Sequence, residues 1–190
     1  HALRTGEVRP HYHALVDLAS GELTGFEILA RWTHPTRGEV PPDLFVALAE
    51  DLGVITEMSC QLLRQACLDA RAWPTHLTLA LNISPLQLRD PWLAERLLQV
   101  LVETGFPPER LEIEITEEAL ISDIEAARTI VTSLKHQGVH VVLDDFGTGY
   151  SSLHYLRDLP FDTLKIDRSF LIGKDDDAEA LSVVSAIIGL

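Results

Sequence analysis

The chain has 190 residues, 46% of them apolar, which is enough material for one sizeable hydrophobic core. Its formal net charge of −14 argues against a protein that coats the DNA duplex. No apolar run approaches the roughly 20 residues of a membrane-spanning helix, and no signal-peptide pattern is present. We therefore expect a soluble, cytoplasmic domain without membrane contact of its own, although a longer parent chain could carry an anchor.

The N-terminal part of the chain predicts a β-hairpin followed by two helices. Two strand-like runs, Val8 to Val16 and Leu23 to Ala30, are separated by a polar turn, and the second run ends before the His34-Pro35 pair. Asp43 is placed to cap a first helix. A longer helix is expected from Thr56 to Trp73.

The longer helix contains both cysteines of the chain, Cys60 and Cys67. A rise of about 1.5 Å per residue separates them by roughly 10 Å, which is too far for a disulfide. We expect buried thiols in a reducing compartment.

Strands and helices alternate over the rest of the chain, with short connections. The predicted strands are Leu77–Asn82, Leu111–Thr116, Val139–Leu143 and Thr163–Asp167. The predicted helices are Trp92–Thr104, a helix opened by the capping box Ser122–Glu125 and ended by Gly138, a short helix near Ser152–Arg157, and one that begins near Asp177. This alternation indicates an α/β fold with a largely parallel sheet.

Polar and charged residues fall at the carboxyl ends of the predicted strands, where α/β folds build their active sites. They are Glu27, Asn82, Glu114, Asp144, Asp145, Lys165 and Asp167. Both β/α barrels and open doubly wound sheets bind ligands at this end. Seven such positions on five strands converge more naturally on the mouth of a barrel than on one crevice.

Asp144 and Asp145 end the short, β-branched strand that begins at Val139. Successive strand side chains point to opposite faces, so the two carboxylates can share a site only where the strand gives way to the turn at Phe146–Gly149. The alternative is an Asx-type turn, in which one aspartate caps Gly147 or Thr148.

The set consists of several carboxylates, one amide oxygen and one lysine, and its hard oxygen ligands favour Mg²⁺ or Mn²⁺ over zinc or copper. Sites of this kind often hold two ions, roughly 3.5–4 Å apart, at a phosphoryl centre. Asp144 or Asp145 would bridge the metals, and Lys165 would supply positive charge.

Each of these residues also has a structural interpretation. Glu27 beside Arg31 is typical of a surface ion pair, Glu114 of a solvated strand face, and Asn82 of a helix entry. Lys165 and Asp167 suit the charged ends of an edge strand. If all of these structural interpretations were correct, every one of the polar groups would lie at the carboxyl end of a strand by coincidence. Taken together, they are therefore weaker than each one alone.

The same residues closely resemble the motifs of the EAL domain, the cyclic di-GMP phosphodiesterase and receptor module of bacterial signalling proteins. The resemblance covers the whole chain. Its motifs are Glu27-Ile28-Leu29-Ala30-Arg31-Trp32, Asn82-Ile83-Ser84, Glu114-Ile115-Thr116-Glu117, Asp144-Asp145-Phe146-Gly147-Thr148-Gly149 and Lys165-Ile166-Asp167.

The resemblance implies a TIM-like (β/α) barrel whose first strand is antiparallel to its neighbour. About six of the eight strands are expected within residues 1–190, as part of a larger multidomain signalling protein. It implies that Mg²⁺ or Mn²⁺ is held by Glu27, Asn82, Glu114, Asp144 and Asp145.

The resemblance also implies roles for the remaining residues. Catalysis is assigned to Glu27, Lys165 and Asp167, and substrate contacts to Arg31, Leu29 and His13. Glu117 is expected to hold the loop that follows the paired aspartates. Where the family has Tyr-Gln-Pro on its first strand, this chain has Tyr12-His13-Ala14.

The implied activity is the hydrolysis of one phosphodiester of cyclic di-GMP, which gives linear pGpG. The last barrel strands and a further catalytic glutamate of the family have no match here, so residues 1–190 alone are expected to be inactive. The alternative is a non-catalytic EAL module that binds cyclic di-GMP or a partner protein. A homodimer and sensor or GGDEF domains elsewhere in the parent chain are the expected partners; DNA is not.

Overall fold

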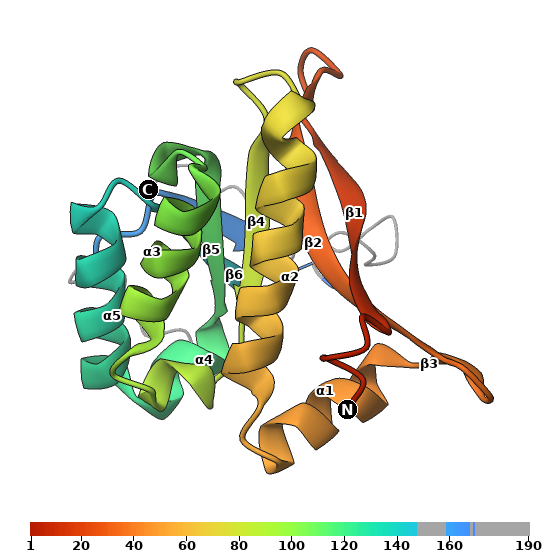
Figure 1. Cartoon of the computed structure of the whole chain (residues 1–190). Coiled ribbons are helices and arrows are strands. Elements are labelled where there is room, and N and C mark those ends of the chain that lie inside the picture. The colour runs from red at the N-terminus through yellow and green to blue at the C-terminus, as the bar shows by residue number, and fades with distance from the viewer. Residues whose placement is uncertain (148–158, 168, 170–190) are drawn as a thin grey trace.

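The computed structural model describes residues 1–147, 159–167 and 169 (Figure 1). Its strands are β1 (Val8–Val16), β2 (Leu23–His34), β3 (Gly38–Val40), β4 (Thr78–Ile83), β5 (Leu111–Thr116), β6 (His140–Phe146) and β7 (Thr163–Ile166). Its α-helices are α1 (Pro42–Asp51), α2 (Ile55–Asp69), α3 (Leu93–Thr104), α4 (Glu117–Ser122) and α5 (Ile124–His136). Short 3₁₀ turns are formed by Ala70–Ala72, Gln87–Arg89 and Pro108–Arg110.

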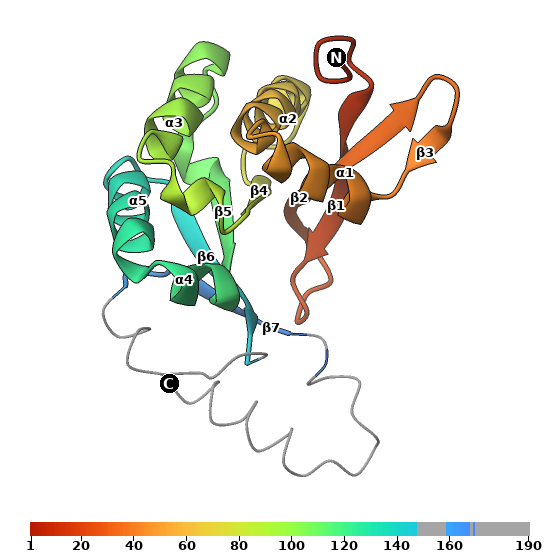
Figure 2. The same ribbon diagram turned by 90° about the horizontal axis from the view of Figure 1, so that it is seen from below.

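The described strands form one sheet in the order β1-β2-β4-β5-β6-β7, with β3 paired to β2. β1 is antiparallel to β2, and the β2–β4, β4–β5, β5–β6 and β6–β7 pairs are parallel. Seen nearly along the strands, the sheet curves into an arc with the helices on its outside (Figure 2). The predicted hairpin and the predicted parallel sheet are both confirmed.

Side-chain alternation gives the sheet two chemically different faces. On the outer face, buried aliphatic residues of β4, β5 and β6 pack against the helices. They are Leu79, Leu81, Ile83, Leu111, Ile113, Ile115, Val141 and Leu143. The opposite, inner face carries the polar residues, because residues that are level in parallel strands point the same way. Asn82 is level with Glu114, and Thr116 is level with Asp144.

The structure corrects several predicted boundaries. β2 continues to His34 instead of ending at Ala30, because its last residues pair with β3. Asp43 does not cap α1, since that helix begins at Pro42 without any side-chain cap. The predicted capping box is wrong at Ser122, which ends α4; Asp123 is the N-cap of α5 and accepts from the Ala126 N–H.

The helix predicted from Thr56 to Trp73 ends earlier, at Asp69, and is followed by the 3₁₀ turn Ala70–Ala72. The helix ends predicted before Gly105 and Gly138 are confirmed. Gly105 and Gly138 follow α3 and α5 with φ values of 64° and 86°, in the left-handed region where glycine carries no strain. The helices predicted near Ser152–Arg157 and from Asp177 lie outside the described residues.

Gly25 allows β2 to approach β4 closely. A Cβ atom at this position would lie 2.3 Å from the Thr78 side-chain oxygen and 2.8 Å from the Thr78 carbonyl oxygen. Both contacts are shorter than any van der Waals approach allows. The absence of a side chain at Gly25 therefore sets the spacing of the two strands that carry Glu27 and Asn82.

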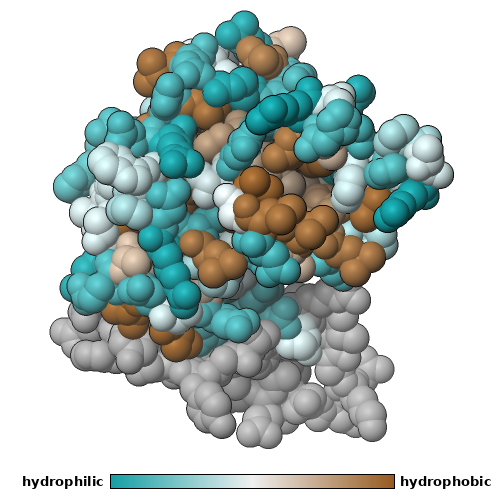
Figure 3. All heavy atoms as spheres, turned by 60° about the horizontal axis from the view of Figure 1, so that its bottom comes forward, coloured by the Kyte–Doolittle hydropathy of each residue, from teal (hydrophilic) through white to brown (hydrophobic). Residues whose placement is uncertain are grey.

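Apolar side chains gather on the face of the molecule turned forward in Figure 3. Two large apolar side chains of α1, Leu44 and Leu48, are exposed, and so is Leu52 just after the helix. Within the described residues, no helix combines the length and apolar character needed to cross a bilayer.

Candidate active site

Glu27 and Asn82 meet across the β2–β4 pair. The Asn82 Nδ2 donates a hydrogen bond of 2.7 Å to Oε1 of Glu27. This bond uses the amide N–H of Asn82 and leaves its carbonyl oxygen as an acceptor. His13, directly opposite Glu27 on β1, brings its Nδ1 to 3.6 Å from the other carboxylate oxygen. Glu27 therefore lies between two nitrogen atoms from neighbouring strands.

Glu114 is the most deeply buried acid of the site, with only 1% of the residue exposed. Its Oε1 accepts a hydrogen bond from the Lys165 Nζ, which reaches across from β7. Its Oε2 is buried and has no hydrogen-bond partner among the described residues. Burial raises the pKa of Glu114 to about 7; the hydrogen bond and charge of Lys165 oppose this rise, while the charges of Glu27 and Asp144 add to it.

Lys165 faces a concentration of negative charge. Burial acts to lower the pKa of its ammonium group, but the hydrogen bond with Glu114 and the charges of Glu114, Asp144 and Glu27 outweigh burial and raise it. Lys165 is therefore held in its charged form at neutral pH. β7 is the last strand in the described sheet, as the edge-strand interpretation expects, but the pairing with Glu114 shows that Lys165 is turned toward the site.

Asp144 and Asp145 lie where β6 loses its regular register. The pairing with β7 shifts between Leu143 and Phe146, and Asp145 has a φ of 53°. Its backbone N–H donates to the Asp144 Oδ1 at 2.9 Å. The pair thus escapes strict alternation at the end of the strand, as predicted. Burial raises the pKa of Asp145, and the charge of Asp144 and the charge and hydrogen bond of Asp167 raise it further.

Glu117, the first residue of α4, secures the backbone after the paired aspartates. Its Oε2 accepts the Gly147 N–H at 2.9 Å, and its side chain is buried. The Asx-type alternative is thereby wrong for Gly147, whose N–H binds Glu117 instead of an aspartate. Thr148 lies outside the described residues.

The predicted substrate-contacting residues lie on β1 and β2. Leu29 and Arg31 line a pocket of about 300 Å³, together with Asn82 and Thr116. The Arg31 guanidinium donates to the Ala30 carbonyl at 2.9 Å. It is not paired with Glu27, whose carboxylate faces Asn82 and His13. The surface ion pair considered for Glu27 and Arg31 is therefore not formed.

Asp167 follows β7 and lies next to β6. Its backbone N–H donates to the Phe146 carbonyl at 3.3 Å, and its Oδ1 accepts from the Ser169 N–H at 2.8 Å. Together with its effect on the pKa of Asp145, this places Asp167 in the neighbourhood of the paired aspartates.

The predicted site residues thus form three neighbouring groups, centred on Glu27, on Glu114 and on Asp144 with Asp145. In the described ranges, no three or more His, Cys, Asp or Glu side chains are grouped so as to hold a metal ion. The charges of Glu27 and Asp144 nevertheless act on both Glu114 and Lys165. The groups share one electrostatic environment at the carboxyl end of the sheet.

Sequence reasoning missed two polar residues that support this region. Thr116 caps α4 by accepting the Ala119 N–H at 3.2 Å, and the pattern of a threonine before two glutamates was the available signal. Gln87 is almost completely buried behind the β4 end of the site. No sequence pattern marked it.

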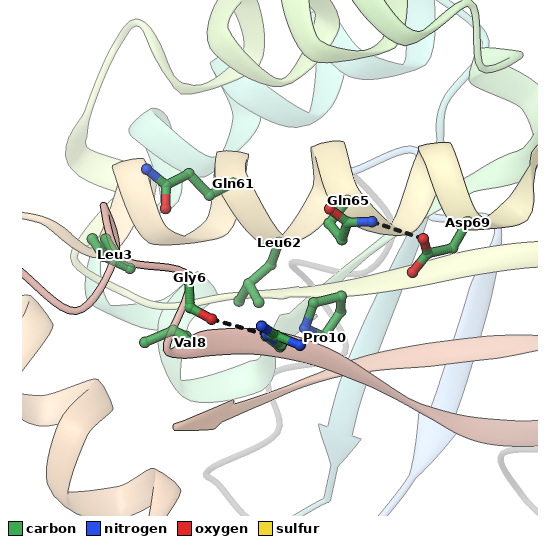
Figure 4. A pocket seen from close by; sticks show the side chains of 9 residues that line it. Leu3, Gly6, Val8, Pro10, Gln61, Leu62, Gln65 and Asp69 are labelled. Carbon is green, nitrogen blue, oxygen red and sulfur yellow. Dashed lines mark hydrogen bonds between the residues drawn. The ribbon is translucent and has the colours of Figure 1, made fainter. Parts of the chain in front are cut away.

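A second hollow, of about 470 Å³, lies between the start of β1 and α2 (Figure 4). It is bordered by Arg9, Gln61, Gln65 and Asp69, and by apolar residues such as Leu62. The Gln65 amide donates to Asp69 at 2.7 Å. None of the predicted site residues lines this hollow, so it is separate from the candidate active site.

Comparisons with known proteins find relatives that match the chain over its whole length. Protein y4lL of Sinorhizobium fredii is 44% identical over 190 residues, 100% of this chain and 23% of that protein. Cyclic di-GMP phosphodiesterase NbdA of Pseudomonas aeruginosa is 39% identical over 193 residues, 100% of this chain and 25% of that protein. The chain therefore spans about a quarter of the length of these curated relatives.

A solved structure described as the PaMucR phosphodiesterase in complex with c-di-GMP is 36% identical and superposes with a TM-score of 0.90. The match covers 99% of this chain and 78% of that one. Its likeness supports the TIM-like barrel architecture, of which the described strands form a part. The family model of the EAL domain matches residues 1–190, and the chain therefore belongs to the EAL domain family.

Proposed function

We propose that this chain is the EAL part of a cyclic di-GMP phosphodiesterase, which hydrolyses the cyclic dinucleotide to linear pGpG. Membership of the EAL family and the relatives named as cyclic di-GMP phosphodiesterases support the substrate. The observation that carries the proposal is the convergence of Glu27, Asn82, Glu114 and Lys165 from four strands on one end of the sheet.

The residues at this end fit a hard divalent cation. The donor set consists of carboxylate and amide oxygens, which Mg²⁺ and Mn²⁺ prefer. The Oε2 of Glu114 is a buried carboxylate oxygen that has no hydrogen-bond donor in the described part of the chain, and a nearby cation would satisfy it. The proposed ligands are Glu27, Asn82, Glu114, Asp144 and Asp145. Bound Mg²⁺ or Mn²⁺, as one ion or as a pair, would supply positive charge to a phosphoryl centre and lower the pKa of water.

The chain's own residues bind and orient the substrate around this centre. Arg31 lines the 300 Å³ pocket together with Asn82, and its guanidinium can bind a phosphate there. Lys165 carries a positive charge next to Glu114, which suits charge that develops on a phosphoryl group. Leu29 and His13 border the same end of β1 and β2 and are assigned to substrate contacts.

Two further residues act on the paired aspartates. Asp167 shifts the pKa of Asp145 and is assigned, with Glu27 and Lys165, to the catalytic group. Glu117 holds the Gly147 amide and so fixes the chain directly after Asp145. We assign this contact to stabilising the loop.

The second candidate function is a receptor that binds cyclic di-GMP without hydrolysing it. The observation that favours it is the Lys165–Glu114 pair, in which the lysine ammonium compensates the charge of the buried carboxylate through one of its oxygens without a metal ion. In either case we propose a homodimeric parent protein with sensor or diguanylate cyclase domains. One relative, MucR, is named as a bifunctional diguanylate cyclase and phosphodiesterase.

The decisive experiment measures turnover of cyclic di-GMP by the natural full-length protein, with Mg²⁺ or Mn²⁺ and with EDTA. Chromatography separates the substrate from pGpG. Metal-dependent formation of pGpG that is lost in Glu27→Ala, but not in the exposed control Glu22→Ala, supports the phosphodiesterase. Binding of the intact dinucleotide without turnover supports the receptor, and neither binding nor turnover contradicts both.

A further inference from the structure

Gln87 is a polar side chain buried in the wall of the candidate site. Only 2% of it is exposed, although it belongs to the 3₁₀ turn Gln87–Arg89 that leads from β4 toward α3. Burial of an amide is unfavourable unless both its ends are hydrogen-bonded. Polar residues of connecting turns are usually exposed to solvent. The hydrogen-bond partners of the buried Gln87 amide therefore indicate its role.

Both ends of the Gln87 amide are bonded. Its Oε1 accepts the backbone N–H of Ser84 at 3.1 Å, and its Nε2 donates to the hydroxyl of Ser59 at 3.0 Å. Ser59 lies on α2 and is itself buried. The Ser84 carbonyl in turn accepts the backbone N–H groups of Gln87 and Leu88 at 3.0 and 3.3 Å. Ser84 is thus held at both of its backbone polar groups, and one of the bonds runs through Gln87 to α2.

Ser84 is two residues after Asn82, whose amide contacts Glu27. Asn82 is an exposed residue, so packing does not fix its side chain. Its orientation depends on the 2.7 Å bond to Glu27 and on the position of its backbone at the end of β4. Gln87, Ser59, Ser84 and Asn82 also line the same 300 Å³ pocket. The bonded chain from α2 through Gln87 to Ser84 therefore sets where β4 ends.

We propose that Gln87 is a positioning residue that, with Ser59 as its anchor, holds Asn82 in place to bind a divalent cation beside Glu27. The inference rests on the proposed function, because it gives Asn82 the role of a metal ligand. Hydrogen bonds that orient a ligand from behind typically change metal affinity or activity 10–100-fold when they are removed. Gln87 does not touch the substrate or the reacting atoms in this assignment.

The test measures the affinity of the full-length protein for Mn²⁺ by calorimetric titration in the absence of nucleotide. The kcat and KM for cyclic di-GMP and the melting temperature are measured for the same variants. The variants are Gln87→Met, which keeps the length of the side chain, and Ser59→Ala, which removes only the anchor. Gln65→Met is the matched control: its amide also makes a side-chain hydrogen bond, to Asp69, but in the separate hollow of Figure 4. Ser59→Thr keeps the hydroxyl.

We expect Gln87→Met and Ser59→Ala each to weaken Mn²⁺ binding at least about tenfold. Their effects should be less than additive in the double variant, because both break the same chain of bonds. Ser59→Thr, which keeps the hydroxyl, should bind Mn²⁺ as the unaltered protein does. Gln65→Met should also leave the Mn²⁺ affinity unchanged. Ser59→Ala carries the test alone if Gln87→Met fails to fold.

Unchanged Mn²⁺ affinity in both variants, with only a lower melting temperature, would show that Gln87 has a purely structural role and overturn the inference. If the unaltered protein hydrolyses cyclic di-GMP and this result is found, the proposed function stands and only the role of Gln87 falls. An unaltered protein that neither binds Mn²⁺ nor forms pGpG overturns both.

Discussion

The side-chain amide of Asn82 lies 2.7 Å from the carboxylate of Glu27, although 55 residues separate them in the chain. The contact exists because β2 and β4 are parallel neighbours with Glu27 level with Ala80. Asn82 is then one alternation further toward the carboxyl end, on the same face. The contact therefore depends on how closely these two strands approach each other.

Gly25→Ala should disturb this approach. The added Cβ would lie within 2.8 Å of the Thr78 carbonyl oxygen, which belongs to the backbone and cannot rotate away. We expect a loss of about 1–3 kcal/mol in the free energy of unfolding, measured by urea denaturation. Adding Thr78→Ala removes the 2.3 Å contact with the hydroxyl but not the backbone contact, and should recover only part of the loss. Full recovery would mean that the backbone approach is not limiting.

Loss of the Glu117 carboxylate should loosen the chain after Asp145. Glu117→Leu leaves the Gly147 N–H without its acceptor, which we expect to cost about 1–3 kcal/mol of stability. Glu117→Gln keeps an oxygen at the same distance and should cost less. Amide hydrogen exchange at Gly147 reports the bond directly, with the exposed neighbour Glu118→Gln as control. Unchanged exchange in Glu117→Leu would contradict the assignment.

Asp162 makes stability depend on pH in the acid range. Partial burial acts to raise its pKa, but hydrogen bonds from Lys135 and the Val141 N–H outweigh burial and lower it from its ordinary value of 3.8. A lowered pKa in the folded state gives stability that is present above pH 3.8 and is lost as the pH falls through the lowered value.

The comparison of unaltered protein with Asp162→Asn tests this expectation. The unaltered protein should be more stable by about 1 kcal/mol at pH 7, an amount reduced by solvent screening of a partly exposed pair. The difference should vanish in strong acid. Glu95→Gln, an exposed acid on α3, is the control. A difference that is equally large at all pH values would show that shape, and not charge, is responsible.

Divalent cations should stabilise the fold through the proposed ligands. At a free Mn²⁺ concentration of 100 times its dissociation constant, binding adds about 2.7 kcal/mol to the free energy of unfolding. The melting temperature should therefore rise with Mn²⁺ and fall again with excess EDTA. Asp144→Asn should remove most of this rise, whereas Asp51→Asn, at the end of α1, should not. An equal rise in both variants would place the cation elsewhere.

The sequence was informative about the order of the elements and about which residues share a face. Strict alternation over Leu111–Thr116 was enough to place Glu114 and Ile113 on opposite faces of the sheet. Gly147, which follows soon after the Asp144-Asp145 pair, indicated that the strand ends there. β3 escaped prediction because three residues are too few for a periodic pattern, and the preceding Pro35 suggested that β2 had already ended.

Contacts between elements could not be predicted in the same way. The Lys165–Glu114 pair depends on the register of β5, β6 and β7, and a register has no signature in one strand alone. Gln87 looks like an ordinary polar residue of a connecting turn. Its burial follows only from the position of α2, which packing of the whole domain decides.

Because side chains alternate between the two faces along β5, this strand is sensitive to the insertion or deletion of a residue. Deleting one residue between Leu111 and Glu114 would turn every following side chain of the strand to the opposite side. Glu114 would then point into the aliphatic layer under the helices, and Ile115 would take its place beside Lys165. Natural variants of this strand are accordingly expected to differ in their residues but to keep its length, while the turn between β1 and β2 is free to grow or shrink.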